Sequence, residues 1–151
     1  MTQVLDLRSA QVLCKPDETG EVAKWVCEGL GDELSEYGNN LTLGIYRNGK
    51  LIAGIILNDL RPNIDVWMTI YSTSKYWATR RTLKYIFWVV FDVMKCRRAS
   101  LFVSKDNETS IKFVEKCGFI REGLLRQYRD NGQDCFVYGM LKSECKWRNY
   151  E

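Results

Sequence analysis

The 151 residues of this chain contain no histidine, and this absence limits the acid–base and nucleophilic chemistry available to it. Serine–histidine and cysteine–histidine machinery is therefore excluded, since both need an imidazole to accept the proton of the nucleophile. A general base in this chain must be a carboxylate, a tyrosine, a cysteine or a water molecule.

Cysteine is the other residue type with reactive or metal-binding potential. No two cysteines form a C-x-x-C pair, and without histidine a structural zinc site is not expected. The N-terminus has no basic segment followed by an apolar stretch, which is what an export signal requires. We therefore expect a cytoplasmic protein with free, buried thiols rather than disulfides. The six cysteines are Cys14, Cys27, Cys96, Cys117, Cys135 and Cys145.

Charge is distributed unevenly along the chain. Residues 1–40 carry three basic and eight acidic side chains, whereas residues 60–100 carry eight basic and two acidic ones. A basic central segment favours a polyanionic ligand, such as a nucleotide cofactor or a nucleic acid. The alternative is that two solvated surfaces carry opposite charge.

The length and composition predict one soluble domain covering residues 1–151. Hydrophobic residues make up 46% of the chain and charged residues 27%, which is typical of a globular protein. No apolar run reaches the roughly 18 residues that a membrane span needs, so no membrane partner is expected.

The elements that must position any reactive groups follow from periodicity and turn residues. Asn48-Gly49 separates two β-rich runs, and this pair favours a two-residue hairpin turn because both positions need a positive φ. We predict strands at residues 11–15, 41–47, 51–58, 64–72, 99–104, 119–129 and 135–142. Helices are predicted between residues 20 and 31, with a second piece to 37, and at 74–94 and 107–116.

The long helix at 74–94 is predicted by an apolar stripe with a period of 3.6 residues. Arg80, Arg81 and Lys84 lie early on this helix, where the helix dipole disfavours cations. A bound anion is one explanation for their placement. The apolar stripe consists of Leu83, Ile86, Phe87, Val90, Phe91 and Met94.

Several motifs resemble the GCN5-related N-acetyltransferase (GNAT) superfamily. Residues 107–126 are similar to the pattern N-x-x-S…E-K-x-G-F-x-x-E-G-x-x-R of its RimJ/RimL-like branch, and residues 138–141 resemble the Y-x-M-L of that branch's last strand. Residues 79–83 and 138–147 also look like small GNAT proteins of phages and prophages. The resemblance implies an α/β (α+β) GNAT fold with a mixed, mostly antiparallel sheet of six to seven strands and about four helices.

The same resemblance implies acetyl-CoA as the acyl donor. The family's pyrophosphate loop, Q/R-x-x-G-x-G/A, aligns with residues 75–80, and Ala78 and Arg80 stand where the family has small residues. The phosphates would bind the backbone N–H groups of a helix N-terminus, which every residue except proline supplies. The donor-binding residues implied at this loop are Lys75, Tyr76, Trp77, Ala78, Thr79, Arg80 and Arg81.

The pantetheine arm of the donor would pair with the backbone near Met68 and Ile70, where the neighbouring strands 64–72 and 99–104 would splay. Asn107 and Ser110 would face the arm from the start of the next helix. Capping that helix is the alternative role of Asn107.

Many family members use a tyrosine of the helix before G-F as the acid for the departing thiolate, and Val114 occupies that position here. Tyr138 and Tyr71 are candidate replacements. The alternative for either tyrosine is a structural hydroxyl with satisfied hydrogen bonds.

For the base, the family often uses a glutamate early in its fourth strand. Asp65 lies close to that position, and the bulge common in that strand would turn it toward the site. Asp59 is a further candidate by proximity. Trp67 and Trp77 are candidates to line an acceptor pocket, and the alternative for both is the core.

The favoured function is transfer of an acetyl group from acetyl-CoA to an amine of a protein or small molecule. One alternative is nucleic-acid modification comparable to the phage Mom protein, motivated by Arg80, Arg81, Arg97 and Arg98. Another is a non-catalytic binding protein. The protein is expected to be a monomer or homodimer, in a host cytoplasm if it is phage-encoded.

Overall fold

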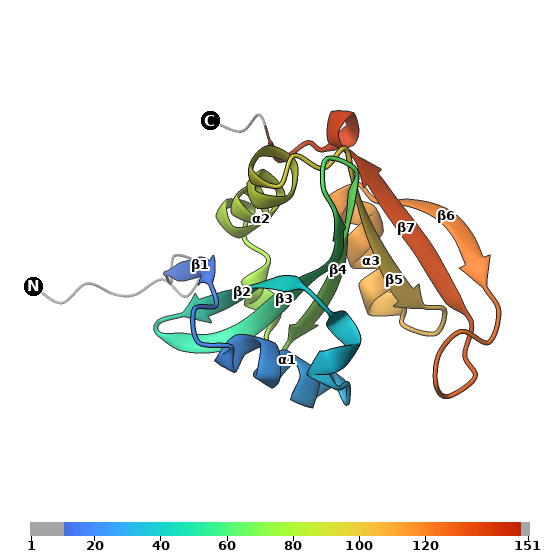
Figure 1. Ribbon diagram of the computed structural model, residues 1–151, viewed down its shortest axis with the longest axis horizontal. Coiled ribbons are helices and arrows are strands. Elements are labelled where there is room, and N and C mark those ends of the chain that lie inside the picture. Colours follow the sequence, from blue (N-terminus) through green and yellow to red (C-terminus); the bar gives the residue numbers. More distant parts are fainter. Residues whose placement is uncertain (1–10, 149–151) are drawn as a thin grey trace, which may run out of the picture.

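The computed structural model describes residues 11–148 and contains one seven-stranded sheet (Figure 1). Its strand order is β1-β2-β3-β4-β5-β7-β6, and every neighbouring pair is antiparallel except β4 and β5. The predicted mixed, mostly antiparallel sheet is thereby confirmed. The strands are β1 Val12–Pro16, β2 Asn40–Arg47, β3 Lys50–Arg61, β4 Asp65–Ser72, β5 Arg98–Ser104, β6 Ile120–Leu125 and β7 Cys135–Leu141.

The β2–β3 hairpin has the two-residue turn that its sequence predicts. Arg47 pairs with Lys50, and the residues between them, Asn48 and Gly49, have φ values of 51° and 82°. Asparagine and glycine adopt this left-handed region most readily, so the turn fixes the hairpin register.

Within residues 11–148, three α-helices accompany the sheet, where the resemblance implied about four: α1 Glu21–Leu30, α2 Arg80–Trp88 and α3 Glu108–Cys117. The second helical piece expected up to residue 37 is a single 3-10 turn, Leu34–Tyr37. The long helix expected to residue 94 leaves α-geometry at Trp88 and ends in a π-helical turn, Val89–Val93.

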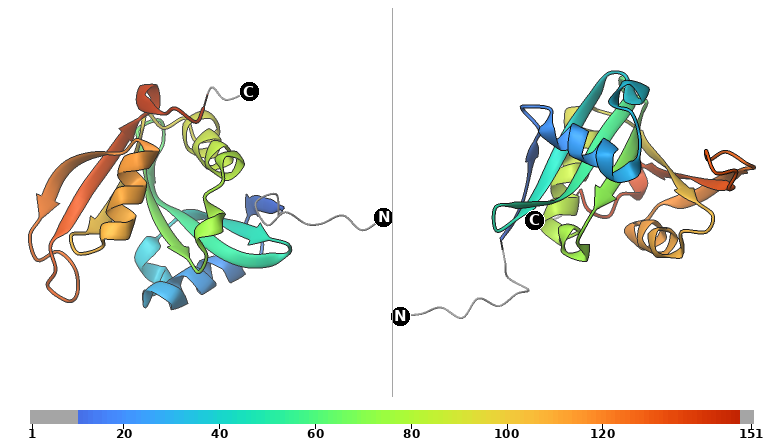
Figure 2. Two further views of the ribbon diagram at one scale, coloured as in Figure 1. Left: turned by 180° about the vertical axis from the view of Figure 1, so that it is seen from behind. Right: turned by 90° about the horizontal axis from the view of Figure 1, so that it is seen from below.

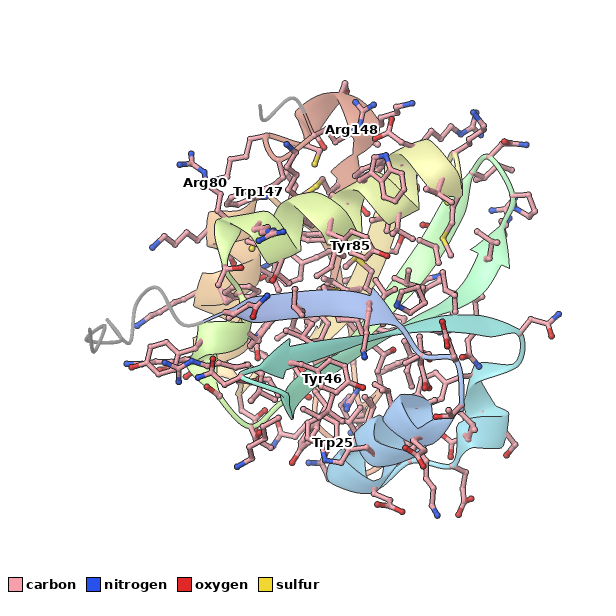
Figure 3. The ribbon with its side chains drawn as sticks, turned by 90° about the vertical axis from the view of Figure 1, so that its left-hand side faces the viewer. Trp25, Tyr46, Arg80, Tyr85, Trp147 and Arg148 are labelled. Carbon is pink, nitrogen blue, oxygen red and sulfur yellow. The ribbon has the colours of Figure 1, made fainter. Side chains whose placement is uncertain are left out.

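Helix α1 covers one face of β2, β3 and β4, where two glycines form a shallow groove for it. Gly44 and Gly54 are cross-strand partners. A Cβ atom at Gly54 would lie 2.4 Å from a methyl group of Val26 and 2.9 Å from one of Val22. The absence of side chains at this pair therefore lets α1 approach the sheet closely. Figure 3 looks at the sheet edge, with α2 on one side and α1 on the other.

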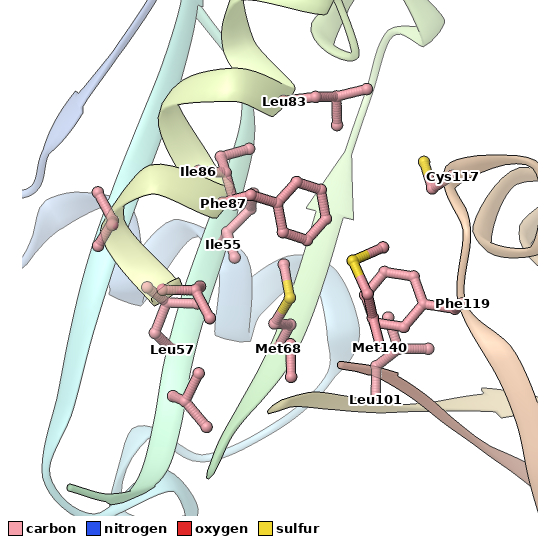
Figure 4. Close-up of a cluster of buried hydrophobic side chains, with 14 of the residues drawn as sticks. Ile55, Leu57, Met68, Leu83, Ile86, Phe87, Leu101, Cys117, Phe119 and Met140 are labelled. Carbon is pink, nitrogen blue, oxygen red and sulfur yellow. The ribbon is translucent and has the colours of Figure 1, made fainter. Parts of the chain in front are cut away.

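The opposite face carries the main core, beneath α2 and α3 (Figure 2). Leu83, Ile86 and Phe87 of the predicted stripe are buried against β3 and β4, as Figure 4 shows. Burying an aliphatic or aromatic side chain of this size contributes roughly 1.5–3 kcal/mol, so this stripe is what holds α2 on the sheet.

The C-terminal tail, residues 143–148, docks on the domain. The indole Nε1 of Trp147 donates to the carbonyl of Cys117, 3.0 Å away, and Arg148 Nη2 pairs with Asp92 Oδ1 at 2.8 Å. The tail thereby connects the end of α3 with the π-helical turn.

Candidate active site

A cleft opens where β4 and β5 part. The two parallel strands pair over only three residue pairs, from Asp65–Arg98 to Trp67–Ser100, and then diverge. The cleft between them has a volume of about 1220 Å³. The splay of these two strands, which the resemblance implied, is therefore present.

The cleft passes through the sheet rather than lying on one face. Tyr71 packs edge-to-face on Trp25 of α1, with ring centroids 5.1 Å apart, so Trp67 and Thr69 also face the α1 side because strand side chains alternate. Met68 belongs to the core on the α2–α3 side. Side chains of both sets line the cleft, which is thus accessible to groups from both faces.

Four of the expected donor-binding residues line the part of the cleft between β4 and α3: Met68, Ile70, Asn107 and Ser110. Beyond Trp67, β4 has no ladder partner on its β5 side within residues 11–148. Its N–H and C=O groups can therefore pair with an extended ligand. Asn107 also caps α3, since its Oδ1 accepts from the N–H of Ser110 at 3.1 Å, so both roles weighed for it are compatible with one position.

The expected phosphate corner connects β4 to α2. Ser74 Oγ accepts from the N–H of Tyr76 at 3.2 Å and starts a 3-10 turn, Lys75–Trp77. Thr79 then caps α2, with its Oγ1 accepting from the N–H of Thr82 at 3.1 Å. The N–H of Leu83 bonds the carbonyl of Thr79 at 2.9 Å and closes the first turn of α2. A helix N-terminus of this kind favours a bound phosphate through its backbone N–H groups and its dipole.

The structure divides the residues predicted for this corner into two sets. Lys75 and Ala78 line the cleft, and so does Trp77, which is buried and packs on Phe113 of α3 with ring centroids 5.3 Å apart. Tyr76, Thr79, Arg80 and Arg81 do not line it. Tyr76 is exposed, and the guanidinium of Arg47 lies 4.3 Å from its ring centroid, so this aromatic ring faces the outside.

Asp65 is bonded to residues of the neighbouring strand β5. Its side chain is buried, its Oδ1 accepts from Ser100 Oγ at 2.7 Å, and Arg98 Nε lies 3.6 Å away. Asp65 does not line the cleft. The bulge that would have turned it lies on the neighbouring strand, because the β3–β4 register shifts between Asn58 and Arg61. This geometry does not support Asp65 as the base.

Tyr138 is also away from the cleft. It is fully buried, its hydroxyl donates to Glu115 Oε2 at 2.6 Å, and Arg121 Nε donates to the same hydroxyl at 3.1 Å. Burial and the hydrogen bond to Glu115 raise the pKa of Tyr138. These contacts match the structural alternative for this tyrosine. Tyr71 does not line the cleft either.

The α1 side of the cleft contains residues that sequence reasoning missed. Asp32, Glu36 and Tyr37 line it from the segment after α1, and Asn58 and Asp59 line it from the end of β3. The Tyr37 hydroxyl donates to Asp32 Oδ2, and burial together with this bond raises the pKa of the phenol. Of these residues, only Asp59 was a candidate from the sequence, by proximity alone.

Aromatic side chains form the other wall of this part of the cleft. Trp67 stacks on Phe102 with ring centroids 4.3 Å apart, and Phe102 contacts Tyr128 at 4.9 Å. Trp67 lines the cleft, and its contact with an acceptor stays a prediction. Carboxylates facing aromatic rings form an environment that favours an organic cation.

The arginines behind the nucleic-acid alternative do not form one surface. Arg80 and Arg81 begin α2, whereas Arg97 and Arg98 follow the π-helical turn at its other end. Arg98 Nη2 also lies 2.6 Å from Glu122 Oε1, which offsets its charge.

A seven-stranded sheet in this order, parting at its parallel pair beside a helix N-terminus, defines the fold class as that of the GNAT acetyltransferases. The chain is similar to the spermidine N-acetyltransferase SpeG of Vibrio cholerae: one structure of a SpeG variant has 16% identity and a TM-score of 0.73, over 92% of this chain and 97% of that chain. SpeG in complex with CoA and spermine has 16% identity and a TM-score of 0.71, over 89% and 97%. A protein described as a putative acetyltransferase has 19% identity and a TM-score of 0.69, over 88% of this chain and 84% of that chain.

At these identities the similarity establishes the fold. No protein-family profile matches the sequence, and no curated protein matches it. Within residues 11–148, no helix has the length and apolar character needed to cross a membrane. The described residues also contain no group of three or more cysteine, aspartate or glutamate side chains that could hold a metal ion.

Proposed function

We propose that this protein is an N-acetyltransferase that moves an acetyl group from acetyl-CoA to an amine by direct transfer. The observation that carries the proposal is the cleft through the sheet, which is open to both faces where β4 and β5 part. A donor arm along β4 would enter from the α2–α3 side and an acceptor from the α1 side. The two substrates would meet inside the sheet, away from bulk water.

The donor site fits acetyl-CoA in its chemistry. The N-terminus of α2 suits the phosphates, Lys75 adds a positive charge beside it, and the unpaired edge of β4 suits the amides of the pantetheine arm. Met68 and Ile70 offer apolar contacts to the same arm.

We infer that the acceptor is an amine that arrives as a cation. Asp32, Glu36 and Asp59 line the α1 side of the cleft, opposite the aromatic wall. The SpeG structure with CoA and spermine, which has the same fold, is consistent with a cationic acceptor. A lysine side chain, a protein N-terminus and a polyamine all satisfy this chemistry.

On the motif at residues 107–126 we further propose that residues 1–151 form one domain of the RimJ/RimL-like branch, similar to phage-encoded GNAT proteins and acting in a cytoplasm. A monomer or homodimer is the proposed state; one of the SpeG structures is dodecameric. Light scattering at assay concentration measures this state directly.

Two measurements on the full chain test the function. Titration calorimetry should show acetyl-CoA binding, and release of the CoA thiol should follow addition of one member of a panel of polyamines, lysine peptides and N-terminal peptides. Ala78→Trp fills the donor corner and should abolish binding, whereas Ser143→Trp, on an exposed residue outside the cleft, should keep it. Binding without turnover of any amine would favour a non-catalytic protein. Absence of binding in the unmodified chain would overturn the proposal.

A further inference from the structure

We propose that Asp59 is the general base of this cleft, and that Asn58 and Thr69 are positioning residues that aim its carboxylate. The inference rests on the proposed function and assigns the proton transfer to one residue. Four features of the structure lead to it: the place of Asp59 in the cleft, its backbone, its hydrogen bonds and the state of the other carboxylates.

Asp59 lies beside the point where the strands part. Its neighbour Asn58 pairs with Trp67 of β4, and Trp67 is the last residue of β4 that pairs with β5. The phosphate corner follows the other end of β4, after Ser72. A donor arm lying along β4 from that corner therefore brings its thioester end toward Trp67 and Asp59.

The backbone at Asp59 is bent for this placement. Between Asn58 and Arg61, β3 contains one residue more than β4 does, and Asp59 has a φ of 53°. A bulge re-aims the side chain it carries, and aspartate is among the residues other than glycine that adopt left-handed backbone most readily. The bulge directs Asp59 into the cleft.

A chain of hydrogen bonds orients the carboxylate. Thr69 Oγ1 donates to Asn58 Oδ1 at 3.1 Å, and Asn58 Nδ2 donates to Asp59 Oδ2 at 2.8 Å. Asn58 is buried, so its amide is held in one orientation. Among the described residues nothing bonds Oδ1 of Asp59, which leaves that oxygen for an N–H group of the acceptor.

The other carboxylates of the cleft lack this combination. Asp32 accepts from the Tyr37 hydroxyl, and Glu36 Oε1 accepts from the backbone N–H of Glu33 at 3.4 Å. Asp130 lies on the loop between β6 and β7, and no hydrogen bond orients its side chain within residues 11–148. Asp32 is likewise oriented through one oxygen, but it lies on the segment after α1, whereas Asp59 is the oriented carboxylate beside the point where β4 and β5 part.

The reaction step balances with the groups named. The acceptor enters as an ammonium ion and gives one proton to Asp59, which passes it to solvent. The neutral nitrogen then attacks the thioester carbonyl carbon, a C–N bond forms and the C–S bond breaks. The second proton leaving the nitrogen neutralises the CoA thiolate, so the products are the amide and CoA in its thiol form.

The test uses the amine that the panel above identifies, with acetyl-CoA as donor. Asp59→Asn removes the base but keeps the bulge, because asparagine also tolerates a positive φ, and it can still accept from Asn58. The kcat should fall about 100-fold, the usual size of a lost general base, with acetyl-CoA affinity unchanged. In Asp59→Gly, added formate should restore part of the rate. Asp106→Asn, an exposed aspartate outside the cleft, is the matched control and should keep full activity.

The outcomes separate the two proposals. An unmodified protein that neither binds acetyl-CoA nor acetylates any amine removes the proposed function and the role of Asp59 with it. An active protein whose Asp59→Asn variant keeps its kcat overturns only the role of Asp59. A raised KM for the amine with an unchanged kcat would instead assign Asp59 to acceptor binding, and would equally sink the base assignment.

Thr69 tests the positioning step without touching the base. Thr69→Val removes the hydroxyl that orients Asn58 and should lower kcat about tenfold, while Thr69→Ser keeps a hydroxyl and should restore it. A role confined to stability predicts equal kcat values for both folded variants, and that result would remove Asn58 and Thr69 from the inference.

Discussion

Asp59 and Asp65 lie on adjoining strands in opposite environments. Asp59 is exposed to the cleft at a bulge, while Asp65 is buried at the first rung between β4 and β5. Arg98 reaches from Asp65 and Ser100 to Glu122, so one guanidinium links β4, β5 and β6. The two residues have the same side chain, so the difference between their environments comes from the local backbone.

Removing Arg98 should therefore destabilise the protein. In Arg98→Ala, Asp65 keeps only the Ser100 hydroxyl while its carboxylate stays buried. Because Arg98 is partly exposed, we expect a loss of about 2 kcal/mol in the free energy of unfolding, below the full effect of breaking a buried pair. Urea unfolding measures this, with Arg97→Ala, on an exposed neighbour, as the control that should change little. Equal midpoints for the two variants would contradict the structural role of Arg98.

The predictions made from sequence for single residues were limited by one unknown, namely the face of the sheet on which each strand side chain lies. Met68 and Ile70 could be placed in the cleft from the resemblance. Alternate residues of a strand face the same side, so placing one of them also places the other. Asp65 was expected to be turned toward the site by a bulge in its own strand, but the bulge lies on β3, and its place leaves no mark on composition. Asp32 and Tyr37 had no signal, since their contact depends on how the chain turns after α1.

At the scale of elements, the close packing of α1 on the sheet depends on Gly44 and Gly54. Gly54→Ala would place a methyl group 2.4 Å from Val26, a stiff, fully buried side chain. We expect a loss of roughly 1–3 kcal/mol as α1 is pushed outward. Gly123→Ala, where an added Cβ meets nothing within 4 Å, is the matched control in the same thermal unfolding experiment. A stable Gly54→Ala variant would show that α1 shifts without cost.

Element order and most boundaries were readable from sequence, because turn pairs and apolar periods are local signals. Asn48-Gly49 is one example, and the stripe from Leu83 is another. The change from α to π geometry after Trp88 was not readable, since the apolar stripe continues unbroken through it. Asp92 of this turn pairs with Arg148, a contact between residues far apart in the sequence that no local pattern predicts.

At the scale of the molecule, the thiols are free and sequestered. Within the described residues all six cysteines are unpaired, five are buried and Cys14 is half-buried, as expected from sequence. Burial raises the pKa of Cys14 to about 12 and the pKa values of Cys96 and Cys117 to about 11. Because the thiolate is the reactive form, a pKa of about 11 leaves only about one thiol in a thousand reactive at pH 8, and the higher pKa of Cys14 leaves fewer.

The native protein should therefore react slowly with a disulfide reagent such as DTNB at pH 8, and the same six thiols should react at once in denaturant. Raising the pH toward the shifted pKa values should speed the native reaction. If one molar equivalent of thiol in the folded protein reacted rapidly with DTNB, one of these cysteines would be accessible. Because the protein thiols should react slowly, a DTNB assay at pH 8 should report the thiol of released CoA rather than the thiols of the protein.

The short junction between β4 and β5 has a mechanical consequence. Only three rungs join a four-stranded half-sheet to a three-stranded one, and a sheet bends most easily where the fewest hydrogen bonds cross it. This weakly paired line of the sheet runs through the cleft described above. A ligand that contacts both β4 and β5 would restrain bending between the two half-sheets. The stiffness of the sheet at this junction therefore depends on whether the cleft is occupied.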